Sequence, residues 1–189
     1  MKNIDNAIAC LEIGSIAFGY RILSEVAAVP KSRIIEASPC GSKFLILLTG
    51  PHEDLKRSVL EVRQQTDSKL WIDSEVFDAK DPRVIEAFYA LPQDPIDKSL
   101  VVVECETVTG CLQAAFSLVE KGGLTPIEIR LQRSSTGGAY GFFTGSTEKC
   151  TSAVESARQA LTASGRRGQV ELINQPPQPF RDFFELSNT

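Results

Sequence analysis

Cysteine is the residue type in this chain best suited to bind a metal or to act as a nucleophile, and one of the five cysteines stands apart. Cys40 lies in "EASPCGSK" (36–43), between a proline and a glycine, which favour a turn between two strands. A thiol in such a turn is expected to be exposed enough to serve as a ligand or a nucleophile. An incidental loop cysteine is the alternative reading. The odd cysteine number and the lack of a CxxC spacing argue against a disulfide framework or a zinc site within one chain.

Other residues offer little for catalysis. His52 is the single histidine, and the sequence has no serine elbow, so hydrolase-type nucleophilic chemistry lacks its components. Glu12 and Glu104 occupy equivalent strand ends, which favours a structural role over an acid–base pair. The glycine-rich stretches "STGG" and "TGS" do not match a phosphate-binding P-loop. The sequence therefore predicts a protein that is not an enzyme.

Composition narrows the class of protein. The chain has 189 residues and a net charge of -4, which argues against a nucleic-acid partner, because such proteins usually carry a basic stripe. No apolar run reaches the roughly 20 residues that span a membrane. The start "MKNIDNAIAC" does not resemble a signal peptide, so the expected location is the cytoplasm, where thiols stay reduced.

The chain contains an internal repeat. Residues 9–26 overlay 101–118 without a gap, which pairs Glu12 with Glu104. Residues 44–62 match 139–157, so the offset grows from 92 to 95 and the second copy gains three residues around "RLQRSSTGGAY". The repeat predicts a first domain at 1–89, a linker at 90–98 and a second domain at 99–189.

Each copy has the pattern of a βαββαβ unit. An apolar strand (7–13; 100–106) precedes a helix that Ser15 or Thr107 caps, two further strands and a second helix follow, and a last strand closes the unit. This order predicts an α/β (α+β), ferredoxin-like fold, in which a four-stranded sheet carries both helices on one face. The buried stripes of the helices are expected at Ile16, Tyr20, Leu23 and Ala27, at Leu55, Val59 and Val62, and at Cys150, Val154, Ala157 and Leu161.

The repeat also separates the cysteines. Four of them have an apolar or small counterpart in the other copy and are predicted to be buried as small hydrophobic residues: Cys10, Cys105, Cys111 and Cys150. Cys40 instead corresponds to the "SSTGG" loop at 134–138, which has no apolar position to fill.

The two βαββαβ copies, the acidic strand end before each helix and the strands that end in "TG" resemble the bacterial microcompartment (BMC) shell domain in tandem, over 7–88 and 99–184. "CGSKF" (40–44) is similar to the "CPGKF" turn of the single-layer trimeric shell proteins of propanediol-utilising compartments, although proline precedes the cysteine here. The resemblance implies a homotrimer in the shell that imitates a hexamer. Its central pore would be lined by Pro39, Cys40, Gly41, Ser42, Ser134, Ser135, Thr136 and Gly137.

The resemblance further implies a [4Fe–4S] cluster that three chains share, with Cys40 as the ligand from each chain. One cysteine per chain cannot hold such a cluster, but a three-fold axis supplies three thiolates and leaves one iron open. The implied role is electron transfer or cluster delivery across the shell.

Some positions depart from that family, and other classes share the fold. Ala28, Glu120 and Gln178 stand where shell proteins carry basic edge residues, so tiling with other shell proteins is expected to be poor. A stand-alone trimer with a plain metabolite pore is one alternative. A trimeric ferredoxin-like regulatory protein that binds a small molecule is another, although Arg166–Gly168 is a faint phosphate loop. An RNA-binding pair of sheets would need aromatic residues on the third strand, where "KFLILLTG" has one phenylalanine.

Overall fold

The computed structural model describes residues 7–89, 96–132 and 136–187. The chain divides into two compact units. The first contains Met1–Pro82 together with two short segments of the second repeat, Glu106–Thr109 and Leu131–Gly138. The second contains Arg83–Cys105, Gly110–Arg130 and Ala139–Thr189. The second unit therefore begins at Arg83, ahead of the 90–98 segment expected as the linker, of which residues 90–95 lie outside the described residues.

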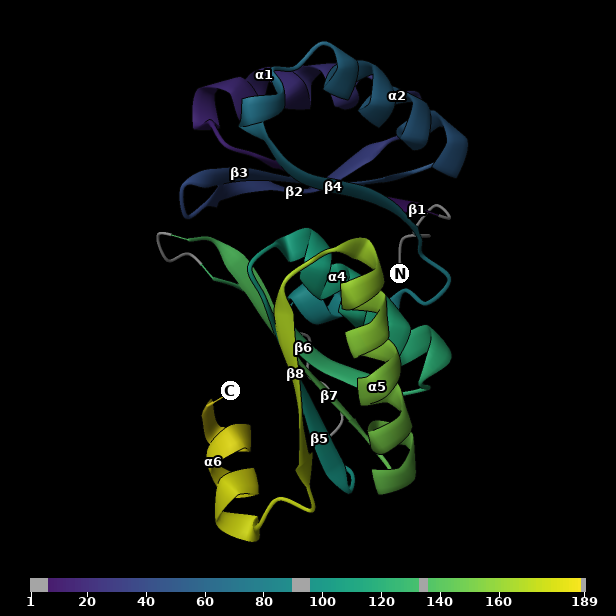
Figure 1. Cartoon of the computed structure of the whole chain (residues 1–189), viewed down its shortest axis with the longest axis vertical. Coiled ribbons are helices and arrows are strands. Elements are labelled where there is room, and N and C mark those ends of the chain that lie inside the picture. Colours follow the sequence, from purple (N-terminus) through teal and green to yellow (C-terminus); the bar gives the residue numbers. More distant parts are fainter. Residues whose placement is uncertain (1–6, 90–95, 133–135, 188–189) are drawn as a thin grey trace. The chain divides into compact units, whose positions relative to one another are not determined.

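The first unit has one antiparallel sheet with two helices on one face (Figure 1). Its elements are β1 (Ala7–Ile13), α1 (Ile16–Val26), β2 (Arg33–Cys40), β3 (Lys43–Gly50), α2 (His52–Gln64), a 3₁₀ turn (Ser68–Leu70) and β4 (Trp71–Asp78). The strand order β2-β3-β1-β4 places β1 between β3 and β4, as the split βαβ pattern predicts.

Local sequence accounts for the start of each helix. The hydroxyl of Ser15 accepts a hydrogen bond from the Phe18 N–H at 3.3 Å, so Ser15 caps α1 as predicted. Pro51 directly precedes α2, and Glu53 and Asp54 place negative charge in its first turn, where the helix dipole favours it. The predicted stripe Leu55, Val59 and Val62 is buried.

The predicted buried face of α1 is wrong. Gly19, Ile22 and Val26 face the core, while Ile16 is 43% and Tyr20 56% exposed. The reason lies at Gly19, because a Cβ there would overlap the Phe44 ring, so the helix approaches the sheet most closely along the glycine side. The apolar residues that sequence periodicity selected therefore lie about one residue, or 100°, away from the buried line.

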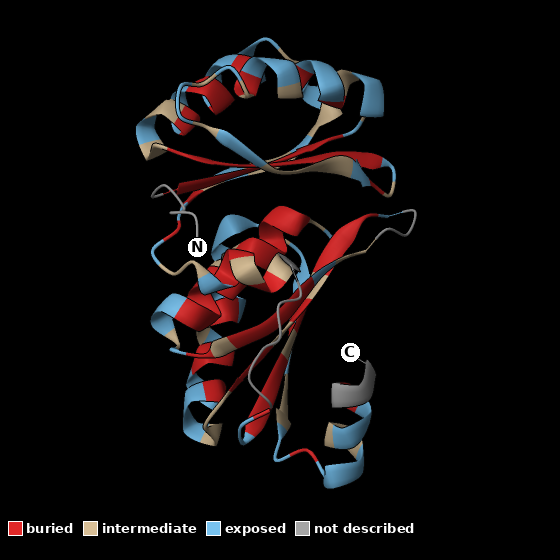
Figure 2. Cartoon of the chain, turned by 180° about the vertical axis from the view of Figure 1, so that it is seen from behind, coloured by how far each residue is buried: buried red, intermediate tan, exposed pale blue. Residues whose placement is uncertain are grey.

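The second unit repeats the sheet in the order β6-β7-β5-β8. Its elements are α3 (Arg83–Glu86), a 3₁₀ turn (Ala87–Tyr89), β5 (Ser99–Cys105), α4 (Val108–Phe116), a π turn (Ser117–Lys121), β6 (Thr125–Gln132), β7 (Gly138–Gly145), α5 (Thr147–Ser164), β8 (Gly168–Asn174) and α6 (Gln178–Ser187). The predicted stripe of α5, from Cys150 to Leu161, is buried. Figure 2 shows buried residues along both sheets and over much of α4. Cys10, Cys105, Cys111 and Cys150 are buried, as predicted.

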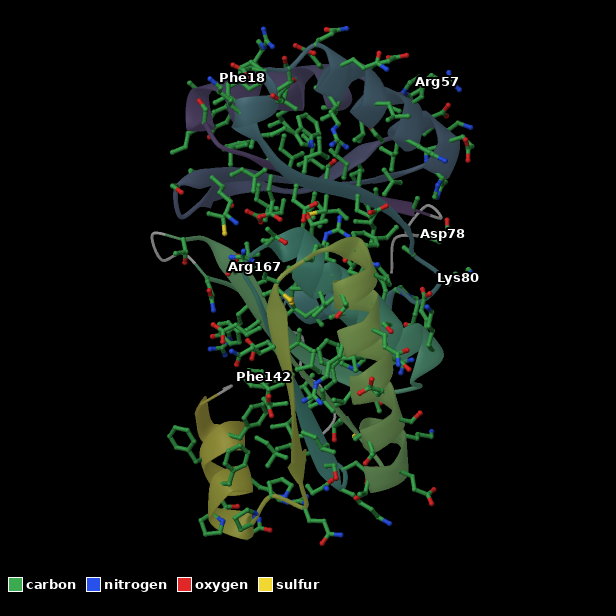
Figure 3. All side chains as sticks on the ribbon, in the orientation of Figure 1. Phe18, Arg57, Asp78, Lys80, Phe142 and Arg167 are labelled. Carbon is green, nitrogen blue, oxygen red and sulfur yellow. The ribbon has the colours of Figure 1, made fainter. Side chains whose placement is uncertain are left out.

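Helix α6 was not predicted, and it covers the sheet face opposite α4 and α5 (Figure 1). Phe142 of β7 points toward α6 (Figure 3), and its ring meets the Phe184 ring edge-to-face at 4.8 Å. Arg181 donates hydrogen bonds to the carbonyls of Ile96 (3.0 Å) and Asp97 (2.8 Å). Helix α6 is therefore tied to the second unit by apolar and polar contacts.

Candidate functional site

The hairpin that carries Cys40 ends in a tight turn. Cys40 is the last residue of β2 and pairs with Lys43 at the start of β3, so the turn consists of Gly41 and Ser42. Gly41 has a φ of 62°, a value that glycine adopts without the steric cost that other residues bear. Pro39 and Ser42 are exposed at this tip.

The expectation that Cys40 is exposed is wrong, because its side chain is only 2% exposed. The Sγ–H of Cys40 donates to the carbonyl of Gln132 at 3.5 Å and contacts that of Gly138 at 3.8 Å. Gln132 and Gly138, nearly a hundred residues away in sequence, thus lie against the thiol. Gln132 ends β6 as Cys40 ends β2, with the offset of 92 between the repeats, so Gln132 is the true counterpart of Cys40.

Gly137 makes this close packing possible. It has a φ of 59°, and a Cβ at this position would overlap the carbonyl oxygen of Cys40. The predicted pore-lining set is therefore brought together in part. Cys40 and Gly41 lie against Gly137, whereas Pro39, Ser42 and Thr136 are exposed. Ser134 and Ser135 lie outside the described residues.

A buried ion pair lies beside the hairpin. Glu12 is 1% exposed, and its Oε2 lies 3.0 Å from Nζ of Lys43, which also donates to the Glu106 carbonyl at 2.7 Å. The positive charge of Lys43 is thus balanced by a buried carboxylate. The structural role predicted for Glu12 holds.

Glu12 also caps helix α4. Its Oε1 accepts hydrogen bonds from the N–H of Thr109 (2.9 Å) and the hydroxyl of Thr109 (2.8 Å). The first N–H groups of a helix have no acceptor within the helix, and a carboxylate satisfies them while matching the helix dipole. Thr107 donates to Asp73 of β4 at 3.1 Å. The segment 106–109 is therefore held at several points within the first unit, and sequence reasoning missed the Thr109 contact because it joins residues 97 positions apart.

The described residues contain no group of three or more histidine, cysteine, aspartate or glutamate side chains that could hold a metal ion. Among the described helices, none is long and apolar enough to cross a membrane. A cluster ligated by Cys40 would accordingly need thiolates from several chains.

Solved structures resemble this chain, whereas no protein family model and no curated protein matches it. A microcompartment protein from Desulfitobacterium hafniense superposes with a TM-score of 0.80 at 20% identity, over 94% of this chain and 99% of that chain. A fused, permuted hexameric shell protein of the RMM microcompartment gives a TM-score of 0.62 at 12% identity, over 83% of this chain and 84% of that one.

A double-ringed trimeric shell protein of the same compartment gives a TM-score of 0.61 at 15% identity, over 83% of each chain. These matches confirm the predicted fold class. The chain has the tandem-domain fold found in solved microcompartment shell proteins.

Proposed function

We propose that the chain is a structural shell protein of a bacterial microcompartment, which assembles as a closed trimer whose six repeats surround a central pore. The likeness to the protein from Desulfitobacterium hafniense, over nearly the full length of both chains, supports this assignment. The main support for the trimer is that the first unit includes two segments of the second repeat. A head-to-tail contact of this kind generates a ring when its rotation closes.

The position of the pore follows from the hairpin tips. Cys40 and Gln132 are counterparts in the two repeats, and they contact each other. Counterparts related by rotation touch only when both lie near the axis. This contact supports a ring axis close to the hairpin tips, with Pro39, Ser42 and Thr136 exposed nearby.

Light scattering of the purified protein tests the ring. We expect a mass about three times the 20.6 kDa of one chain. Expression of a tagged chain in a bacterium that forms microcompartments tests the shell role, with enrichment in the purified shell fraction as the expected result. A stable monomer at micromolar concentration contradicts the ring, and exclusion from the shells contradicts the shell role.

The [4Fe–4S] cluster at Cys40 stays a prediction. In one chain the thiol donates its hydrogen to a main-chain carbonyl, so the side chain would have to turn away and lose its proton to ligate iron. This geometry does not fit a cluster as it stands. It favours the second candidate, a plain metabolite pore in which Cys40 holds the two hairpin tips together.

Iron and sulfide counts on anaerobically purified and reconstituted protein distinguish the two candidates. A cluster predicts iron and a brown colour that Cys40→Ser abolishes and Cys111→Ala retains, because Cys111 is a buried residue of α4. A wild-type protein without iron after reconstitution, or a Cys40→Ser protein with as much iron as wild type, leaves the plain pore.

Assembly beyond the trimer depends on edge residues. Ala28, Glu120 and Gln178 are exposed, and none supplies the positive charge expected at a tile edge. We infer that the trimers do not form extended sheets by themselves. Electron microscopy of concentrated protein should show discrete particles, and ordered flat layers at physiological salt contradict this inference.

A further inference from the structure

The first unit contains a pocket that shares no residue with the predicted pore-lining set. The pocket has a volume of about 210 Å³ and lies between the end of α2, the 3₁₀ turn and the start of β4, which is an edge strand of the sheet. This volume is below the usual range for a drug-sized ligand and suits a small metabolite. The pocket is lined by Arg63, Thr66, Ser68 and residues 71–74.

The internal repeat shows what distinguishes this part of the first unit, because the strand registers identify the equivalent residues of the second. Ile13 pairs with Trp71, and Cys105, which lies 92 residues later, pairs with Gly168. Gly168 therefore stands where the first repeat has Trp71. The register of β4 shifts here, so that Ile72 is an extra residue in a β-bulge, whereas β8 pairs with β5 without a shift. A bulge bends its strand, and bulges are common beside binding sites.

An arginine near the end of the second helix of each repeat shows a further difference. Arg63 and Arg158 lie 95 residues apart, which is the offset between the matched helices α2 and α5. Arg158 donates hydrogen bonds from Nε (3.1 Å) and Nη2 to the carbonyl oxygen of Val170 on β8. Val170 is the counterpart of Ser74 in the strand registers. In the second repeat this arginine is therefore bound to the edge strand.

Arg63 has no corresponding partner. Within the described part of the chain, its guanidinium forms no hydrogen bond and no ion pair, although it lines the pocket. The hydroxyl of Ser68 likewise forms no side-chain hydrogen bond to another described residue. A guanidinium presents N–H donors in a planar fork that matches a carboxylate. The pocket thus offers hydrogen-bond donors that the chain itself does not use.

The strand side of the pocket is largely apolar. Trp71 is half-buried, and its Nε1–H donates to Oγ of Ser74 at 3.0 Å. The polar atom of the indole is therefore already satisfied, and the rest of the ring provides apolar surface. The bulge residue Ile72 is exposed and adds to this surface. A ligand with an apolar body gains free energy by covering both side chains.

The charge of the pocket favours a ligand with a single negative charge. Asp73 accepts a hydrogen bond from the hydroxyl of Thr107 at 3.1 Å, so this carboxylate is held in place in the pocket wall. Its negative charge offsets the positive charge of Arg63. A ligand with two or more negative charges, such as a phosphate, is therefore repelled more strongly than a monoanion.

We propose that this pocket binds a small carboxylic acid as its monoanion. The carboxylate accepts hydrogen bonds from Arg63 and Ser68, and the apolar body covers Trp71 and Ile72. The carboxylate oxygen takes the role at Arg63 that the carbonyl of Val170 has at Arg158. This inference goes beyond the proposed shell function, and it requires neither the ring nor the cluster.

The fluorescence of Trp71 tests the site directly, because this residue is the single tryptophan of the chain. The probes are benzoate and hexanoate, their neutral amides, and inorganic phosphate, each titrated into the purified full-length protein. We expect a saturable change in fluorescence with at least one of the two carboxylates. Its amide should bind about tenfold more weakly or less, because a hydrogen bond to a charged group is lost. Phosphate should give no saturable change.

Arg63→Gln and Arg158→Gln provide a matched pair of variants. Arg63→Gln should weaken carboxylate binding about tenfold or more, and it should leave the affinity for the amide and the midpoint of urea unfolding unchanged. Arg158→Gln should lower that midpoint, because the hydrogen bonds to Val170 are lost, and it should leave the affinity for the carboxylate unchanged. Circular dichroism confirms that both variants are folded under the conditions of the titration.

Each other outcome overturns a stated part of the proposal. The absence of a saturable signal with both carboxylates overturns the site. Equal affinity for a carboxylate and its amide, or an unchanged affinity in Arg63→Gln, overturns the role of Arg63. Phosphate binding as tight as that of the carboxylates overturns the preference for an apolar monoanion. Light scattering of the same samples tests the ring separately, so a failure of the ring and a failure of this site are distinguishable.

Discussion

The Sγ of Cys40 lies 3.5 Å from the carbonyl oxygen of Gln132, and these two residues end equivalent strands of the two repeats. A side chain that sequence alone places in an open turn is instead enclosed by the matching hairpin of the other repeat. The contact depends on the close approach of the backbone at Gln132, Gly137 and Gly138 to Cys40, and its contribution to stability can be measured.

Gly137→Ala should destabilise the fold more than Gly165→Ala. Both glycines have positive φ, so both alanines carry the left-handed strain of about 1–2 kcal/mol. A Cβ at Gly165 meets nothing within 4 Å, whereas one at Gly137 overlaps the Cys40 carbonyl and forces a backbone shift that costs about 1–3 kcal/mol more. Urea unfolding of the two variants gives the difference, and equal values would show that the two hairpins do not pack as described.

Lys43→Met should destabilise the protein strongly, because it leaves the Glu12 carboxylate buried without its cation. Loss of one partner of a buried pair costs about 3–5 kcal/mol. Adding Glu12→Gln should cost less than the sum of the single changes, with a coupling energy of about 1–3 kcal/mol in a double-mutant cycle from urea unfolding. Arg57→Met is the control, because its pair with Asp54 (3.5 Å) is exposed and should contribute under about 1 kcal/mol. Additive effects at Glu12 and Lys43 would contradict the pairing.

Phe184→Ala and Phe183→Ala offer a matched pair on α6. Phe184 is buried against Phe142, while Phe183 is 71% exposed. Truncation of the buried ring should lower the free energy of unfolding by about 3 kcal/mol, and truncation of the exposed ring should change it by under about 0.5 kcal/mol. Thermal unfolding followed by circular dichroism measures both. A larger effect at Phe183 would mean that α6 packs through its other face.

Stability should fall as the pH rises above about 9. Burial, and secondarily the charge of Asp97, raises the pKa of the Cys150 thiol above its usual value near 9. In the unfolded chain this thiol ionises at its usual pKa, whereas in the folded chain it keeps its proton. The unfolded state therefore binds fewer protons in this range, and the free energy of unfolding decreases with pH. Urea unfolding at about pH 7.5 and pH 9.5 should show a smaller loss for Cys150→Ala than for wild type, and an equal loss would assign the pH effect to other groups.

Local sequence patterns were sufficient to predict much of the fold. The strand at 7–13, the cap at Ser15 and the stripes of α2 and α5 depend on residues near each other in sequence, and all are present. The four buried cysteines followed from the repeat, because an apolar counterpart indicates an interior position. Such features carry their own signal in periodicity and composition.

Features that depend on distant packing were missed. Periodicity identified Ile16 and Tyr20 as an apolar stripe but could not show that Gly19 faces the sheet instead. The burial of Cys40 is produced by residues more than ninety positions away. Helix α6 follows two prolines, which indicate a loop, although proline also suits the residues just before a helix. In each case the sequence did not indicate which surfaces of the folded chain pack against each other.

The covalent link between the two repeats affects how the proposed ring responds to dilution. Linked domains meet at a high effective concentration whatever the protein level in the cell. The hydrogen bonds that Lys43 donates to the Glu106 carbonyl and that Thr109 donates to Glu12 join the two repeats of one chain, and they never have to form by collision between molecules. Contacts between separate chains must form by diffusion, so the fraction of chains that are assembled depends on the protein concentration. Contacts within a chain and between chains alternate around the proposed ring. A falling protein concentration would therefore break only the contacts between chains and release single chains whose two repeats stay together.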